Sequence, residues 1–223
     1  MIELKNITKK YGEKTVYSGF DLCLEEGKVT AVLGESGSGK TTLLNILASL
    51  TDYSGTVSGL ERGAPVSYVF QSDRLVPNLT VQQNLMLTCG GKNADTAEIS
   101  AALEKAGLGG YEKAYPSALS AGMKRRVALL RAFLFDSPVI LMDEPFINLD
   151  PALKYSLMDM FKEFRKDEGK TAVFVTHDVK EACYLADRII IISNGKIIYD
   201  KPNRGQEGEK ELLEIMLKTG RKI

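Results

Sequence analysis

A glycine-rich loop that contains a lysine carries the plainest chemical signal in the sequence. It reads Gly34-Glu35-Ser36-Gly37-Ser38-Gly39-Lys40-Thr41-Thr42 and fits the pattern G-x-x-x-x-G-K-[ST]. Glycines let the backbone curl so that several N–H groups point at phosphate oxygens, and the N-terminus of the following helix adds partial positive charge. In such a loop Lys40 would bridge the β- and γ-phosphates, and the Thr41 hydroxyl would be a ligand of Mg²⁺. The loop therefore predicts a site for a nucleoside triphosphate.

Two carboxylates offer a second chemical feature. The apolar run from Val139 to Met142 predicts a central strand of a parallel sheet, buried on both faces, and it ends in Asp143 and Glu144. Unpaired buried charge is costly, so a purely structural reason for two acids at this place is weak. Beside a phosphate loop, Asp143 would hold Mg²⁺ and Glu144 would orient the water that attacks the γ-phosphate. The alternative is a pair of solvated acids at a strand end.

Gln71 and His177 also follow predicted strands, which span residues 65–70 and 172–175. Ligand contacts in α/β proteins gather at the carboxyl ends of the strands. A glutamine there often does no more than end its strand, and a lone histidine is usually structural. At this edge of the sheet, however, His177 becomes a candidate contact for the γ-phosphate.

Three further residues have both a structural and a functional interpretation. Tyr11 is either a half-buried turn residue, which the local sequence favours, or an aromatic plate for a purine base. Ser120 is a good helix N-cap, and together with Gly122 and the following helix N-terminus it could also bind an anion. Asp150 before Pro151 is fully explained as a helix cap.

The elements that must position these residues alternate between strand and helix. Val29 to Leu33 predicts a buried strand entering the glycine loop, and Thr41 to Leu50 an apolar helix leaving it. Residues 2–33 predict β-structure, whereas 78–137 predict helices without a strand. We therefore expect one domain, with a core from 1–77 and 138–223 and a helical subdomain at about 78–137.

Local signals give several further expectations. Gly90 to Asn93 should break the chain, and Asp95 to Ala106 should form an amphipathic helix. Asp178 and Glu181 have the spacing of a capping box. Asn194-Gly195 predicts a tight turn between two strands, and a last helix is expected over residues 209–217.

Composition excludes several classes of protein. Hydrophobic residues make up 44% and charged residues 26%, which fits a soluble globular protein. The formal net charge is zero, so no nucleic-acid footprint is expected. The three cysteines are far apart and predict reduced thiols in a cytosolic protein. No apolar run approaches the roughly 20 residues of a membrane span, and the N-terminus lacks the pattern of an export signal.

In this order the motifs resemble the ATP-binding subunits of ABC transporters over nearly the whole chain. The resemblance implies an α/β P-loop NTPase fold, with a RecA-like, mostly parallel core, an N-terminal antiparallel β-subdomain and an inserted helical subdomain. It makes Tyr11 the aromatic residue that stacks on adenine, and it places Gln71 in the glutamine loop. It places Leu119 to Met123 in the signature segment, Asp150 in the loop that crosses to a partner, and His177 at the switch histidine.

The resemblance also implies a mechanism. Two subunits, copies of this chain or this chain and a paralogous ATPase, would close head to tail around two ATP. Ser120 and Gly122 would then contact the γ-phosphate bound by the other subunit. Glu144, His177, Gln71 and Lys40 would serve hydrolysis, and Thr41, Gln71 and Asp143 would hold Mg²⁺.

The implied partners are integral membrane permease subunits, which would dock near residues 71–84 at the cytoplasmic face of the membrane. An extracytoplasmic solute-binding protein would act through the permease, and no nucleic acid is expected. ATP hydrolysis would thus drive import of a small solute by a peripheral membrane protein.

The signature segment departs from its usual form. The family commonly has LSGGQ, whereas this chain has LSAGM, with Ala121 and Met123 at the changed positions. LSGGM-type segments followed by basic residues are similar to those of importer ATPases for nitrate, sulfonates and taurine, and Phe146 agrees with an importer. Ile147 and Asn148 replace a pair of small residues. The alternatives are an exporter or lipid-handling ATPase, a soluble ABC protein acting on ribosomes or DNA, and a nucleotide-binding module without catalysis.

Overall fold

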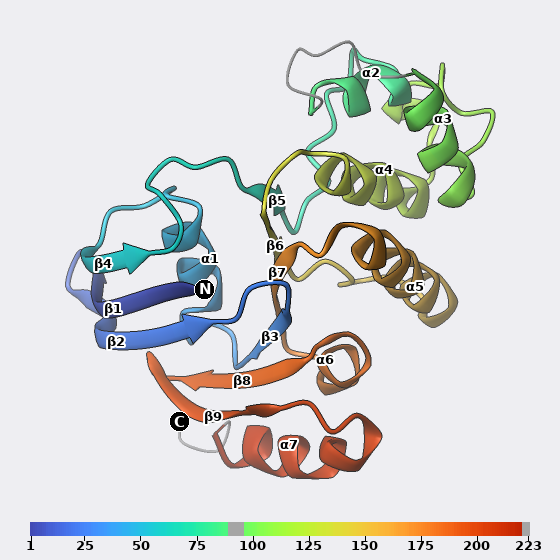
Figure 1. Cartoon of the computed structure of the whole chain (residues 1–223). Coiled ribbons are helices and arrows are strands. Elements are labelled where there is room, and N and C mark those ends of the chain that lie inside the picture. Colours follow the sequence, from blue (N-terminus) through green and yellow to red (C-terminus); the bar gives the residue numbers. More distant parts are fainter. Residues whose placement is uncertain (89–95, 220–223) are drawn as a thin grey trace.

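The computed structural model describes residues 1–88 and 96–219 and arranges their strands in two sheets (Figure 1). A three-stranded antiparallel sheet has the order β2-β1-β4, and a six-stranded sheet has the order β5-β6-β7-β3-β8-β9. The strands are β1 Ile2–Tyr11, β2 Lys14–Leu24, β3 Val29–Leu33, β4 Ser54–Ser58, β5 Ser67–Val69, β6 Val139–Asp143, β7 Thr171–Thr176, β8 Arg188–Ser193 and β9 Lys196–Pro202. The helices are α1 Lys40–Leu47, α2 Val81–Met86, α3 Thr96–Lys105, the 3₁₀ helix η1 Pro116–Ala118, α4 Ala121–Phe133, α5 Pro151–Glu168, α6 Val179–Leu185 and α7 Gln206–Thr219.

The larger sheet is parallel except at one edge. Strands β5, β6, β7, β3 and β8 run parallel, and β9 pairs antiparallel with β8 through the turn at Asn194 and Gly195. Every residue of β3, β6 and β7 is buried, as expected for central strands covered on both faces. The predicted P-loop NTPase fold is confirmed.

One face of the large sheet is covered by α1 and the small sheet, and the other by the remaining helices of the core and by α4 (Figure 1). Alternate side chains of a strand point to opposite faces, so Val173 and Val175 pack with α1 and the antiparallel sheet. Ala172 and Phe174 pack instead into the apolar cluster that holds residues of α4, α5, α6 and α7. Both faces of the central strands are therefore shielded from solvent, and their carboxyl ends form the accessible edge of the sheet.

The region between β5 and β6 is helical in its described part, with α2, α3, η1 and α4 and no strand. That it forms a separate subdomain with limits at 78 and 137 stays a prediction. Thr80 caps α2 in a full capping box with Gln83. The predicted chain break at residues 90–93 and the thiol of Cys89 lie outside the described residues.

Two local predictions are wrong. The helix after the glycine loop ends at Leu47 and not at Leu50, because Ser49 has a φ of +55° and cannot continue a right-handed helix. Asp178 caps α6, but Glu181 does not complete a capping box. The Glu181 carboxylate is buried and accepts a hydrogen bond from the Thr176 hydroxyl at 2.6 Å, so a tertiary partner outweighs the local one.

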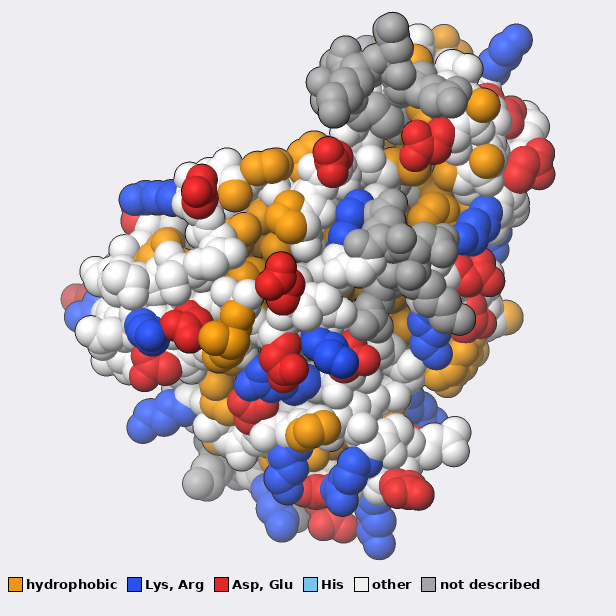
Figure 2. Space-filling model, in the orientation of Figure 1, with side chains coloured by type: hydrophobic (Ala, Val, Ile, Leu, Met, Phe, Trp, Pro, Cys, Tyr) orange, Lys and Arg blue, Asp and Glu red, His pale blue; other side chains and the backbone are white. Residues whose placement is uncertain are grey.

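The surface is mixed in charge. Figure 2 shows Lys and Arg side chains interspersed with Asp and Glu on the face it presents, in keeping with the zero net charge. Cys23 and Cys183 are free thiols. Among the described residues, no helix has both the length and the apolar character needed to cross a bilayer.

The turn between β8 and β9 gives a test of the packing between the two sheets. Gly195 has a φ of +70°, and a Cβ there would lie 2.1 Å from the carbonyl oxygen of Val16 on β2. Gly195→Ala should therefore lower the free energy of unfolding by about 2–4 kcal/mol, since it adds a clash to left-handed strain. Gly205→Ala is the control, because Gly205 has a φ of +60° and no atom within 4 Å of its Cβ position. Urea unfolding should give a loss of only about 1 kcal/mol for the control, and equal losses would contradict the contact with β2.

Candidate nucleotide-binding site

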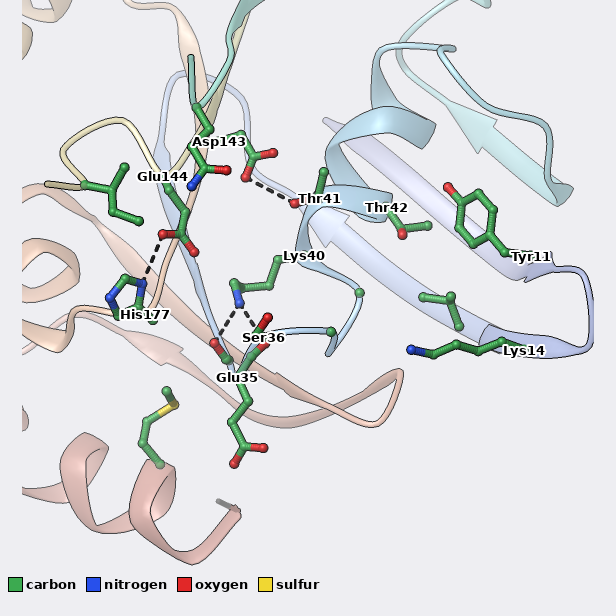
Figure 3. A pocket seen from close by; sticks show the side chains of 17 residues that line it. Tyr11, Lys14, Glu35, Ser36, Lys40, Thr41, Thr42, Asp143, Glu144 and His177 are labelled. Atoms are coloured by element: carbon green, nitrogen blue, oxygen red, sulfur yellow. Dashed lines mark hydrogen bonds and ion pairs between the residues drawn. The ribbon is translucent and has the colours of Figure 1, made fainter. Parts of the chain in front are cut away.

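A pocket of about 790 Å³ opens at the carboxyl ends of the parallel strands (Figure 3). Residues from the ends of β3, β5, β6 and β7 line it, together with residues of β1, β2 and α7. The lining residues are Tyr11, Lys14, Val16, Gly34, Glu35, Ser36, Gly37, Gly39, Lys40, Thr41, Thr42, Gln71, Asp143, Glu144, Ile147, His177 and Met216.

Strand register brings the polar residues of this pocket together. Leu33 at the end of β3 pairs with Thr176 at the end of β7, and Val175 pairs with Asp143 at the end of β6. The residues that follow these strands must therefore share one edge, because parallel strands present their carboxyl ends on the same side.

Lys40 lies at the floor of the glycine loop and is only 6% exposed. Its ammonium donates to the carbonyl oxygens of Gly34 at 2.7 Å and Glu35 at 2.8 Å, as Figure 3 shows. Burial lowers the pKa of Lys40, and the carboxylates of Glu144, Asp143 and Glu35 oppose that shift. The loop thus holds one buried cation among peptide groups, which is the arrangement expected of a phosphate cradle.

Thr41 and Asp143 form a pair of oxygen ligands beside this loop. The Thr41 hydroxyl donates to the Asp143 carboxylate at 3.2 Å. Burial raises the pKa of Asp143, the bond from Thr41 opposes that shift, and the nearby Glu144 adds to it. A hydroxyl next to a buried carboxylate with surplus negative charge is a donor set that suits Mg²⁺, a hard cation that prefers oxygen.

Glu144 follows β6 in a strained conformation. Its φ is +44°, a left-handed value that few residues with a side chain adopt, and its N–H donates to the carbonyl oxygen of Val175 at 3.0 Å. The turn aims the carboxylate at His177, whose Nδ1 lies 3.0 Å from Glu144 Oε2 (Figure 3). The carboxylate is therefore held at the pocket by backbone geometry and by an imidazole.

The antiparallel sheet forms the other end of the pocket. Tyr11 ends β1, is 48% exposed, and pairs in the hairpin with Lys14 of β2. The hydroxyl of Tyr17 donates to the carbonyl oxygen of Gly39 at 2.8 Å and so ties β2 to the glycine loop. An exposed ring that lines the same pocket as Lys40 is compatible with a base platform, and that role for Tyr11 stays a prediction.

The pocket lining lacks four residues that the sequence assigns to the site: Ser38, Ser120, Gly122 and Asp150. Ser38 is buried within the glycine loop, whereas Ser120 and Asp150 are exposed at the starts of α4 and α5. Ser120 caps α4 by accepting from the Met123 N–H at 3.2 Å. These two helix starts are close together, because a Cβ on Gly122 would lie 2.5 Å from Leu153 Cδ2.

Four pocket residues were missed by the sequence analysis: Lys14, Val16, Ile147 and Met216. Hairpin pairing with Tyr11 could have suggested Lys14, and the loop after Glu144 could have suggested Ile147. No local signal marks Met216, because only the packing of α7 beneath the sheet brings it to the pocket.

An ion-pair cluster supports the segment that carries His177. The Lys154 ammonium of α5 lies 2.9 Å from Asp178 Oδ2 and 2.7 Å from Glu181 Oε1. Burial alone would raise the pKa of Asp178, but the hydrogen bond and charge of Lys154, together with the N–H groups of Lys180 and Glu181, more than offset it and leave that pKa lowered. Lys154 thus connects α5 to Asp178, the N-cap of α6, and to Glu181 in the first turn of α6.

Known proteins resemble this chain throughout most of its length. A family model described as ABC transporter matches residues 17–147. An aliphatic sulfonates import ATP-binding protein of Rhodococcus jostii is 40% identical over 201 residues, which cover 90% of this chain and 82% of that protein. A thiamine import ATP-binding protein of Brucella abortus is 37% identical over 214 residues, covering 90% of this chain and 88% of the relative.

A solved structure shares the fold. A bacterial ABC transporter cassette, determined as a dimer, superposes with a TM-score of 0.80 at 31% identity. The match covers 92% of this chain and all of the solved one. A post-hydrolysis dimer of the same cassette, bound to ADP and phosphate, superposes with a TM-score of 0.79.

The Lys154 cluster gives a prediction on stability. Lys154→Met should lower the free energy of unfolding at neutral pH by about 1–3 kcal/mol, because it leaves two carboxylates without their cation. The lowered pKa of Asp178 stabilises the fold above the ordinary pKa of aspartate, and this contribution is lost as the pH falls below about 4. Bonds to the two carboxylates raise the pKa of Lys154 despite burial, so its contribution is lost above about pH 10. In urea unfolding from pH 3 to 11, the difference in free energy of unfolding between the parent and Lys154→Met should become smaller at both ends of the pH range. Lys180→Met, on the exposed side of α6, is the control and should have the stability of the parent throughout.

Proposed function

Because the chain belongs to the ABC transporter family of ATP-binding proteins, we propose that it is the ATP-hydrolysing subunit of an importer for a small organic solute. The observation that carries the proposal is the single pocket that unites Lys40, Asp143, Glu144 and His177 at one edge of the sheet. A phosphate cradle, a cation site and a positioned base are the parts that ATP hydrolysis requires.

Lys40 and the N–H groups of the glycine loop would bind the β- and γ-phosphates, with contacts from Glu35, Ser36, Gly37, Ser38, Gly39 and Thr42. Thr41 and Asp143, with the Gln71 amide, would hold Mg²⁺. The bound cation would neutralise charge on the β- and γ-phosphate oxygens.

Glu144 would accept a hydrogen bond from the attacking water and orient its lone pair at the γ-phosphorus. The water oxygen would bond to phosphorus as its proton passes to Glu144, the bond from phosphorus to the bridging oxygen would break, and ADP and inorganic phosphate would leave. His177 would fix the Glu144 carboxylate through Nδ1 and present its other ring nitrogen to the γ-phosphate, a role supported by the 3.0 Å contact.

A second copy of the chain, or a paralogous ATPase, would complete the site. Ser120, Gly122 and Asp150 lie outside the pocket that they are predicted to serve, which supports a head-to-tail pair in which each copy closes the other's site. Ala121 is compatible with this arrangement, because it lies in the first turn of α4 without a positive φ. The solved relative is itself a dimer.

Import is supported by the relatives, whose names assign them to the import of aliphatic sulfonates and of thiamine. The chain would bind permease subunits peripherally at the cytoplasmic face of the membrane, with the docking site near residues 71–84. Solute selection would rest with the permease and with an extracytoplasmic solute-binding protein.

Glu144→Gln tests the catalytic assignment. It should lower the turnover of Mg·ATP at least about 100-fold, because the amide cannot act as a base, while nucleotide binding persists. Size-exclusion chromatography with light scattering should then detect an ATP-dependent dimer that the parent forms only transiently. Glu207→Gln is the control, since Glu207 is exposed at the start of α7. Turnover equal to the parent's would refute the role of Glu144.

Tyr11→Ala tests the base platform. Loss of stacking should weaken ATP binding by about 1–3 kcal/mol, or roughly 5- to 150-fold, in calorimetric titrations. Tyr111→Ala removes another exposed tyrosine, which lies outside the pocket, and should bind ATP like the parent. If both variants keep the parent's affinity, Tyr11 is a turn residue only.

A further inference from the structure

Arg125 is a buried arginine of α4 that lies outside the nucleotide-binding pocket. It is 5% exposed, and its guanidinium lies where three chain segments meet. These segments are α4, the turn after β6 and the loop after β5. A guanidinium offers five N–H donors in a rigid plane, so one side chain can bind several fixed acceptors.

One side of this guanidinium holds the turn that carries Glu144. Arg125 Nε donates to the carbonyl oxygen of Pro145 at 2.6 Å, and Nη2 donates to that of Glu144 at 3.4 Å. These are consecutive carbonyls of a turn that begins with the left-handed φ of Glu144. Such a conformation persists only when its surroundings fix it, and Arg125 supplies two of the fixing bonds.

The other side of the guanidinium holds the segment that carries Gln71. Nη1 donates to the carbonyl oxygens of Phe70 at 2.8 Å and Gln71 at 3.4 Å, and it lies 3.3 Å from Asp73 Oδ1. Burial lowers the pKa of Arg125, and the charge of Asp73 opposes that shift. The carboxylate therefore compensates the buried cation.

The same loop is fastened elsewhere to the helical region. Arg131 of α4 donates to the carbonyl oxygens of Arg74 at 2.9 Å and Asp73 at 3.3 Å. Asn84 of α2 is fully buried and donates to the carbonyl oxygens of Val76 and Leu79. From residue 70 to residue 80, then, the loop is held by α2 and α4, and Arg125 is the contact shared with the Glu144 turn.

We propose that Arg125 is a positioning residue that couples the orientation of α4 to the placement of Gln71 and Glu144. A shift of α4, whose N-cap is Ser120, would be transmitted through one rigid guanidinium to both segments. The rate of ATP hydrolysis in one copy of the chain thereby depends on the orientation of α4 in that same copy. The inference rests on the proposed function, because Gln71 and Glu144 are the groups it positions.

The test compares Arg125→Gln and Arg125→Lys in the full chain, with thermal unfolding as a measure of folding. Neither glutamine nor lysine can span both segments, because neither has the planar fork. We expect kcat for Mg·ATP to fall about tenfold to a hundredfold, as displaced catalytic groups do. ATP affinity should change less than about threefold, since Lys40 and Tyr11 are untouched.

Two arginines of the same helix are matched controls. Arg126→Gln removes an arginine that donates to the carbonyl oxygen of Ala106, within the helical region, and should leave kcat unchanged. Arg131→Gln removes contacts to the loop alone and should lower kcat less than Arg125→Gln does. Hydrogen–deuterium exchange should rise at both residues 70–74 and residues 144–148 in the Arg125 variants, whereas Arg131→Gln should raise it at residues 70–74 alone.

Specific outcomes would overturn the inference. Folded Arg125 variants with kcat within about twofold of the parent would do so, as would kcat and ATP affinity falling together with the unfolding temperature. If neither variant folds, Asp73→Asn decides, because it keeps the arginine and removes its counter-charge; unchanged kcat and exchange would then refute the proposal. A parent without ATPase activity would count against the proposed function itself, whereas an active parent with unaffected variants would count against the role of Arg125 alone.

Discussion

The site depends on one constraint, the parallel register of β6, β7 and β3. Pairing of Asp143 with Val175, and of Leu33 with Thr176, brings the ends of three strands to one line. Each strand is buried on both faces, so a slip by one residue would move every side chain of that strand from the core in which it packs into the opposite core. The hydrophobic packing that stabilises the sheet therefore also fixes the distances among Lys40, Glu144 and His177.

Buried polar groups then adjust what the sheet has placed. Arg125, Lys154 and Glu181 are largely inaccessible, and each bonds to groups in the segments that follow β6 or β7. Left unpaired, such groups would be costly, so each fixes its neighbours more firmly than an apolar contact could. The loops at the carboxyl edge of the sheet are accordingly held by hydrogen bonds from charged side chains.

The sequence was sufficient for the fold and for residues that belong to local motifs. The glycine loop, the acids after β6 and the histidine after β7 follow apolar runs that identify their strands. The sequence did not predict residues whose role comes from tertiary contacts, such as Met216 of α7 and Arg125 of α4. The wrong capping box shows the same limit, since Glu181 has a buried partner in Lys154 that no spacing along the chain reveals.

The bond between Tyr17 and Gly39 has a consequence for cohesion between the two sheets. Tyr11, Lys14 and Val16 come from the antiparallel sheet, whereas the phosphate cradle belongs to the parallel one. ATP in this pocket would touch both and act as an additional cross-link. By mass action, a ligand at a hundred times its dissociation constant adds about 2.7 kcal/mol to the stability of the form that binds it. A bound nucleotide would thus also contribute to the cohesion of the two sheets between turnovers.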